Sequence, residues 1–167
     1  YLAEDINIDA TKVIAIGHSR LGKAALWAAA QDARFAAAIS NNSGAVGAAL
    51  SRRQFGETVK IITALFPHWF TPKLNDYRDQ VDRLPVDQHQ LVALLAPRPV
   101  YVASASEDLW ADPKGEFLSA SQAELVYRLF DKDANNLLTM PAAGDGVAGP
   151  ISYHLRPGKH DLLEFDW

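Results

Sequence analysis

The sequence contains no cysteine, no excess of basic residues and no long hydrophobic run. Without cysteine among the 167 residues, disulfides and cysteine-zinc sites are excluded, although the cellular compartment stays open. The 16 Lys and Arg residues against 20 Asp and Glu residues leave a net charge of −4. This charge balance lacks the excess of basic residues that nucleic-acid-binding proteins carry, so we expect no nucleic-acid partner. No apolar run reaches membrane-spanning length, and we expect no membrane partner.

The chain is long and apolar enough to form one folded domain. Apolar residues make up 49% of the sequence, which is typical of globular proteins. A length of 167 residues suits a single domain with a substantial core. We therefore expect one domain over residues 1–167.

Four short apolar runs predict β-strands. The runs are Val13–Gly17, Phe35–Ile39, Val100–Ser104 and Ile151–Leu155. The first three are continuously apolar, which is typical of strands buried on both faces of a parallel sheet. Because helical stretches lie between them, the pattern predicts an α/β fold with right-handed crossovers.

Capping signals predict where the helices begin. A helix over Gly22–Gln31 follows the first strand. Asp87 with Gln90 three residues later matches a capping box. Asp112 before Pro113 predicts a third helix that runs to about residue 130.

The stretch from residue 66 to residue 84 has a different character. It mixes aromatic residues, prolines and charges without clean periodicity. We interpret it as a long excursion across one end of the sheet, where binding loops commonly lie.

A serine stands at the sharp turn between the first strand and the first helix. The pattern G-x-S-x-x-G from Gly17 to Gly22 is close to the nucleophile elbow of α/β-hydrolases, although Leu21 occupies the position of the second glycine. Such a turn strains the backbone of Ser19 and exposes its hydroxyl beside the N–H groups of a helix N-terminus. The alternative is an ordinary strand-to-helix turn in which Ser19 is a plain N-cap.

A nucleophilic serine requires a histidine base and a carboxylate that orients it. His160 lies in a glycine-proline loop after the last strand, where a catalytic histidine is expected, whereas His154 lies inside that strand and has a purely structural interpretation. Glu107 and Asp108 both follow the third strand, and either could be the acid. The alternative interpretation is that these side chains are solvated loop residues. No His/Asp cluster has metal-ligand spacing, so we expect no metal site.

Taken together, these residues resemble the glucuronoyl esterases of carbohydrate esterase family 15, especially their bacterial branch. The resemblance covers essentially the whole chain, and its most specific motifs are the elbow Ser19–Lys23 and the loop Glu107–Pro113. The other matching stretches are Ser43-Gly44, Ala48–Arg53, Phe55–Thr58, Phe66–Phe70, Leu84–His89, Ala96–Tyr101 and Tyr153–His160.

The resemblance implies an α/β-hydrolase fold, a three-layer α/β/α arrangement with a mostly parallel sheet. Several strands and an oxyanion-hole loop normally precede the elbow in this fold. We therefore expect residues 1–167 to be the C-terminal part of an incomplete domain whose N-terminal strands are missing, with an unpaired edge at the first strand. The resemblance also implies a secreted or periplasmic protein, no cofactor, and a glucuronoxylan ester as the partner substrate.

The catalytic roles follow from the same resemblance. Ser19 is the implied nucleophile and His160 the implied base. Many fungal members carry a glutamate where this chain has Asn42, so the acid position of bacterial members, Asp108, is implied instead. Arg20 is implied to support the oxyanion through its backbone N–H and its guanidinium. The alternative for Arg20 is a surface ion pair.

Three further residues match the substrate-binding positions of the family. Lys23 and Glu57 are implied to bind uronate hydroxyls, and Trp110 to pack near the uronate ring. The alternatives are an exposed helix lysine, an exposed acid and a core tryptophan. The implied activity is a carboxylic-ester hydrolase of the 4-O-methyl-glucuronoyl methylesterase type. An acetyl-xylan or other carbohydrate esterase, and a non-catalytic carbohydrate-binding relative, are the alternative functions.

Overall fold

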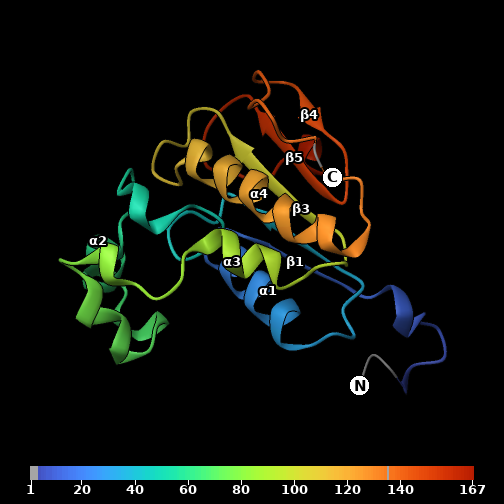
Figure 1. Ribbon diagram of the computed structural model, residues 1–167, viewed down its shortest axis with the longest axis horizontal. Coiled ribbons are helices and arrows are strands. Elements are labelled where there is room, and N and C mark those ends of the chain that lie inside the picture. Colours follow the sequence, from blue (N-terminus) through green and yellow to red (C-terminus); the bar gives the residue numbers. More distant parts are fainter. Residues whose placement is uncertain (1–3, 135) are drawn as a thin grey trace.

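A five-stranded sheet with strand order β1-β2-β3-β5-β4 organises the computed structural model, which describes residues 4–134 and 136–167 (Figure 1). The strands are β1 Ile14–His18, β2 Ala37–Asn41, β3 Val100–Ala105, β4 Gly146–Val147 and β5 Ile151–Arg156. All neighbours pair in parallel except β4, which runs antiparallel to β5. The four predicted strands are therefore confirmed. The two-residue β4 was not predicted, because so short a strand has no recognisable periodicity.

The main helices are α1 Arg20–Gln31, α2 Val59–Leu65, α3 Gln88–Ala93 and α4 Pro113–Tyr127. The predicted capping box at Asp87 is present, with the Asp87 N–H donating to Gln90 Oε1 at 2.8 Å. Asp112 accepts a hydrogen bond from the Gly115 N–H at 3.0 Å and Pro113 occupies the first turn of α4. These local signals begin the helices where the sequence predicts them.

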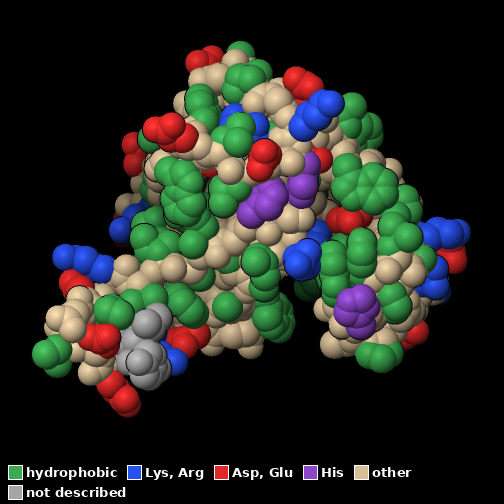
Figure 2. Space-filling view, turned by 180° about the vertical axis from the view of Figure 1, so that it is seen from behind, with side chains coloured by type: hydrophobic (Ala, Val, Ile, Leu, Met, Phe, Trp, Pro, Cys, Tyr) green, Lys and Arg blue, Asp and Glu red, His purple; other side chains and the backbone are tan. Residues whose placement is uncertain are grey.

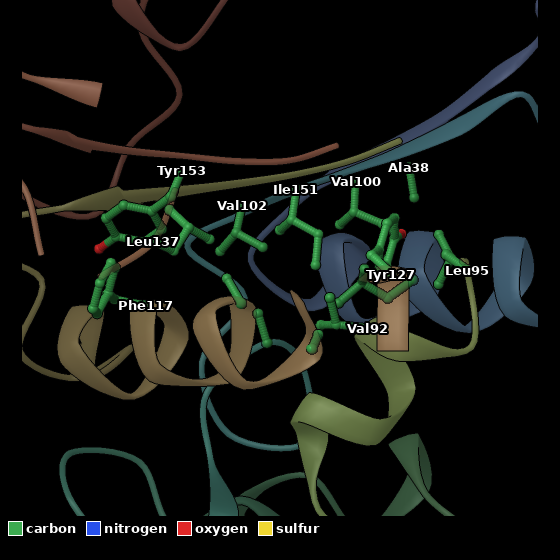
Figure 3. Packing of buried hydrophobic residues seen from close by; sticks show 14 of the residues in the cluster. Ala38, Val92, Leu95, Val100, Val102, Phe117, Tyr127, Leu137, Ile151 and Tyr153 are labelled. Carbon is green, nitrogen blue, oxygen red and sulfur yellow. The ribbon is translucent and has the colours of Figure 1, made fainter. Parts of the chain in front are cut away.

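The hydrophobic core lies between one face of the sheet and the helices α1, α3 and α4 (Figure 3). Ala38, Val100 and Ile151 lie in one row across neighbouring strands, and their side chains are buried against those helices. In the part of the chain that the structure describes, the main helices that pack on the sheet cover this one face. The second helical layer of the three-layer arrangement is therefore not formed by residues 4–134 and 136–167.

The prediction that the first strand is buried on both faces is wrong. Ile14 is 48% exposed and Ile16 40% exposed. The strand β1 is at the end of the sheet and pairs only with β2. Ile16, Ile39 and Tyr101 form the neighbouring row, on the face opposite the helices. The apolar run therefore reflects a strand that lacks cover on one side, and the expected unpaired edge at β1 is confirmed.

The helix α2 and the segment after it project to one side of the sheet (Figure 1). Residues 67–83 contain short 3-10 helices rather than a regular element, which agrees with the predicted excursion. In this projecting lobe, residues 59–84, α2 packs against the short helices that follow it. Among the described residues, no helix is long and apolar enough to cross a membrane.

Candidate active site

Ser19 occupies the turn between β1 and α1 with a backbone that L-residues rarely adopt. Its φ and ψ angles are 57° and −127°. Although Ser19 stands at the N-cap of α1, its side chain makes no capping hydrogen bond. The plain N-cap interpretation therefore does not hold. The strained conformation is that of a nucleophile elbow, which leaves the hydroxyl available for chemistry.

A close approach of strand and helix permits this turn. A Cβ at Gly17 would lie 2.0 Å from the Leu21 backbone oxygen, so no larger residue fits there. A Cβ at Gly22 would lie 2.9 Å from the Ser43 Cβ. Both glycines of the motif are therefore required by space, and the shift of the second glycine by one position still serves the turn.

His160 and Asp108 form a hydrogen-bonded pair at the same edge of the sheet. His160 Nδ1 lies 2.5 Å from Asp108 Oδ2. Asp108 is 5% exposed, whereas the Glu107 side chain is exposed to solvent. The hydrogen bond to Asp108 raises the pKa of His160, against an opposing effect of burial. Of the two candidate acids, the structure thus brings Asp108 to the histidine.

The turn that carries Ser19 contacts the loop of His160 through the side chain of a second histidine, His18. The rings of His18 and His160 lie 4.6 Å apart between centroids. His18 Nδ1 lies 2.5 Å from Asn41 Oδ1, which fixes its ring beside β2. Figure 2 shows histidine side chains gathered at the centre of this face, beside a notch in the surface. Sequence reasoning did not assign His18 a place in the site, because its ring reaches His160 only through the fold.

Ser19 and His160 form no direct hydrogen bond in this structure. Among the described residues, neither Ser19 Oγ nor His160 Nε2 forms a hydrogen bond. Because Nδ1 faces Asp108, the neutral His160 carries its lone pair on Nε2. Such hydrogen bonds are often long in structures without substrate and shorten in the reacting complex.

Lys23, Glu57 and Trp110 form a connected cluster beside the elbow. Lys23 Nζ donates to the oxygens of Ser43 and Ala45, the latter at 2.7 Å, and to Glu57 Oε2 at 3.1 Å. The indole N–H of Trp110 donates to Glu57 Oε1 at 3.3 Å. Burial lowers the pKa of Lys23, which Glu57 partly offsets.

The exposure of this cluster differs from residue to residue. The Lys23 ammonium has three N–H groups, and all of them face these internal partners. A substrate hydroxyl therefore binds Lys23 only by replacing one of them. Glu57 is 8% exposed and Trp110 48% exposed, so the indole ring presents the largest free surface.

Arg20 is exposed and points toward the projecting lobe. Its guanidinium carbon lies 5.8 Å from the centroid of the Trp69 ring, within the range of a cation–π contact. The Trp69 ring stacks on Phe66 at 4.0 Å. At the start of α1, the N–H groups of Arg20 and Leu21 have no acceptor within the helix. The alternative interpretation of Arg20, a surface ion pair, is not formed among the described residues, and the guanidinium lies against this ring instead.

Glu116 on α4 is a buried acid that sequence reasoning missed. It accepts hydrogen bonds from the N–H groups of Ser43 and Gly44, at 2.7 and 3.0 Å, and from Ser104 Oγ at 2.6 Å. Burial raises the pKa of Glu116 to about 7. It holds the turn whose Ser43 carbonyl binds Lys23. The available signal was an acid on the apolar face of the helix, a feature that Glu124 shares.

His154 has the structural role that its position in the strand suggested. It is buried, with Nδ1 2.5 Å from the Tyr101 hydroxyl and Nε2 2.9 Å from Asp166 Oδ1. Burial is the main cause that lowers its pKa. Among the described residues, no group of His, Asp and Glu side chains could hold a metal ion.

A mostly parallel sheet, a strained serine at the N-terminus of a helix and a His–Asp pair on later loops define an α/β-hydrolase. A family model described as "Glucuronyl esterase, fungi" matches residues 2–131. "Carbohydrate esterase MZ0003", from an unknown prokaryotic organism, is 54% identical over all 167 residues, which cover 39% of that relative. The chain therefore belongs to the glucuronyl esterase family.

Further relatives agree with this assignment. "4-O-methyl-glucuronoyl methylesterase 1" from Wolfiporia cocos is 33% identical over 128 residues, which are 72% of this chain and 31% of that relative. The solved "Glucuronoyl Esterase from Solibacter usitatus" is 51% identical with a TM-score of 0.95, over 100% of this chain and 43% of that chain. The chain thus spans about two fifths or less of the length of these relatives.

Proposed function

We propose that the protein is a serine carboxylic-ester hydrolase that cleaves the ester between (4-O-methyl-)glucuronic acid on xylan and lignin alcohols. The observation that carries the proposal is the strained Ser19, whose hydroxyl is not used as a helix cap. The His160–Asp108 pair beside it supports the same conclusion. The names of the relatives add the substrate class, because two of them are glucuronoyl esterases.

In the first half of the proposed reaction, Ser19 Oγ attacks the ester carbonyl of the uronate. His160 Nε2 accepts the serine proton and then delivers it to the departing alcohol oxygen. Asp108 holds the imidazole in the Nδ1–H tautomer and stabilises the imidazolium that forms. In the second half, water attacks the acyl-enzyme with His160 again as base, and the uronic acid and free Ser19 are regenerated.

Negative charge develops on the carbonyl oxygen during both attacks. The first N–H groups of α1, including that of Arg20, and the positive end of the helix dipole face this region. We assign the Arg20 backbone to the oxyanion hole and its exposed guanidinium to the same charge. A cationic donor at this position favours the alkoxide over the neutral ester.

We assign uronate recognition to Lys23, Glu57 and Trp110. Glu57 is a carboxylate that accepts hydrogen bonds from Lys23 and Trp110, and carboxylates also accept hydrogen bonds from vicinal hydroxyl groups. The partly exposed Trp110 ring offers a flat apolar surface to a sugar ring. Because xylan esterified to lignin is a polymer outside the cell, we also propose that the protein is secreted or periplasmic.

Labelling with a fluorophosphonate probe tests the proposed chemistry. We expect the protein to be modified at Ser19, and the variant Ser19→Ala to remain unmodified. Wild-type protein that is not labelled would support a non-catalytic carbohydrate-binding protein instead.

A comparison of two substrates tests the proposed specificity. We expect faster hydrolysis of a methyl ester of glucuronic acid than of acetylated xylose. Faster release of acetate would assign the protein to the acetyl-xylan esterases and overturn the roles given to Lys23, Glu57 and Trp110.

A further inference from the structure

Arg156 is a buried arginine at the end of β5, four residues before His160. It is 2% exposed, and its guanidinium faces the loop that carries the histidine. Nη1 donates to the backbone oxygen of Pro157 at 2.9 Å. Nη2 donates to the backbone oxygens of Lys159 and Asp161, at 2.8 and 3.0 Å. One side chain therefore binds the backbone on both sides of His160.

The guanidinium is itself held from the C-terminal segment. Arg156 Nε donates to Asp166 Oδ2 at 3.0 Å. Asp166 also accepts from the Leu163 N–H at 2.8 Å and lies 2.9 Å from His154 Nε2. The Asp166 side chain has no exposed surface. A buried carboxylate with this many donors fixes the orientation of the planar guanidinium.

The same loop is tied to the loop of the acid. The Glu107 N–H donates to the Gly158 oxygen at 2.9 Å, and the Ser106 N–H donates to the Arg156 oxygen at 2.8 Å. These bonds join the loop of His160 to the loop of Asp108 by backbone alone. The His160 ring, by contrast, is held only at Nδ1 among its own polar atoms, and its side chain is 41% exposed.

We propose that Arg156 is a positioning residue for His160. Its guanidinium fixes the backbone on both sides of the histidine, so that Nε2 stays directed at Ser19 while Nδ1 stays on Asp108. The inference rests on the proposed function, in which His160 is the base. An exposed histidine whose ring is held only at Nδ1 needs such support, because a displacement of about 1 Å in a catalytic group lowers rates about 10²-fold.

The variant Arg156→Lys tests this role. The lysine keeps the positive charge beside Asp166, but one ammonium cannot bind that carboxylate and the three carbonyl oxygens together. We expect kcat on a methyl ester of glucuronic acid to fall about 10²-fold with KM changed less than about twofold, since the substrate-binding cluster is untouched. The rate of fluorophosphonate labelling of Ser19 falls in parallel.

Arg98→Lys is the matched control. Arg98 also binds three backbone oxygens, those of Ala29, Asp32 and Phe35, but it lies before β3 at the opposite end of the sheet. Both substitutions remove a guanidinium that joins backbone segments. We expect Arg98→Lys to lower the unfolding temperature without lowering kcat per folded molecule.

The outcomes separate this inference from the proposed function. If wild-type Ser19 is not labelled, the proposed function fails. If the wild type is labelled and folded Arg156→Lys is labelled and turns over as fast, the positioning role is overturned while the hydrolase assignment stands. If Arg156→Lys does not fold, Asp166→Asn keeps an acceptor for the guanidinium, and we expect a smaller loss of kcat at constant KM. Unchanged kcat in folded Asp166→Asn would then overturn the inference.

Discussion

At the scale of single residues, two buried carboxylates have contrasting surroundings. Asp108 accepts a hydrogen bond from His160, and Glu116 is enclosed by backbone N–H groups and serine hydroxyls. Both are buried acids, but their hydrogen-bond partners differ. One is paired with a base at the surface, whereas the other is paired with neutral donors inside the fold.

Replacement of Asp108 should change both the rate and its pH dependence. The base must be neutral, so activity rises as pH increases through the pKa of His160, which Asp108 raises. In Asp108→Asn we expect this rise at lower pH, together with a loss of about 10⁴-fold in kcat, because the imidazole loses its orienting charge. A pH profile of kcat/KM measures both effects.

Glu107→Gln is the control for this prediction. The Glu107 side chain is exposed and adjacent in sequence, so its substitution should leave the profile unchanged. A profile altered by Glu107→Gln, with Asp108→Asn fully active, would reverse the assignment of the acid.

The protonation of Glu116 should make stability depend on pH. Burial raises its pKa from 4.5 to about 7 in the folded protein. The folded state therefore binds more protons than the unfolded state between these values, and stability falls as pH rises through this range. We expect the free energy of unfolding to drop between pH 5 and pH 8 by about 2 kcal/mol more in wild type than in Glu116→Gln.

Urea unfolding of the two proteins at both pH values measures this difference. The comparison removes the contributions of other titrating groups, which the two proteins share. Equal pH dependence in the two proteins would show that Glu116 has the same proton affinity in both states.

At the scale of elements, the elbow depends on the contact between β1 and α1. The Cβ added by Gly17→Ala would meet backbone atoms of Leu21, which cannot rotate away. We expect the variant to lose about 1–3 kcal/mol of stability through overpacking. Because the start of α1 must shift, we also expect labelling of Ser19 to slow about 10²-fold.

Ala24→Gly separates the two effects of Gly17→Ala. Ala24 is an exposed residue of the same helix, and its replacement should cost about 1 kcal/mol through helix propensity alone. Thermal unfolding and fluorophosphonate labelling of both variants measure the outcome. If Gly17→Ala labels as fast as Ala24→Gly, the close approach at Gly17 does not control the geometry of the nucleophile.

At the scale of the whole molecule, β1 presents an open edge and a partly uncovered apolar face. Ile14 and Ile16 are partly exposed, and with Ile39 they belong to the face opposite the helices. An edge strand with free N–H and C=O groups is a template for pairing with another strand. The polypeptide of residues 1–167 therefore carries a surface that favours association.

We expect this polypeptide to self-associate through β1 and Ile16→Lys to reduce that association, because a charge on an edge strand opposes pairing. Sedimentation velocity over a range of concentrations measures the effect. Leu138→Lys is the control, because Leu138 is 75% exposed but lies outside the sheet. Equal suppression by both variants would place the association elsewhere or attribute it to net charge.

Local signals in the sequence were sufficient for the four longer strands, for the starts of α3 and α4 and for the elbow, but not for β4 or α2. Asp87, Asp112 and the glycines around Ser19 act on neighbours within about one helical turn, so their effects are readable from the chain alone. The resemblance to a known family added the choice of acid. The neighbouring Glu107 and Asp108 could not be separated by local pattern, because both follow the same strand.

Only the tertiary structure decided which distant groups meet. Asp108 and His160 are 52 residues apart, and Lys23 and Glu57 are 34 apart. Tertiary packing likewise decides three further features, which are the burial of Glu116, the hydrogen bonds of Arg156 to the His160 loop and the exposure of β1. Interactions between near neighbours in the sequence determine local conformation. The proton affinity and the orientation of a side chain depend instead on the charges and the burial that the whole fold creates around it.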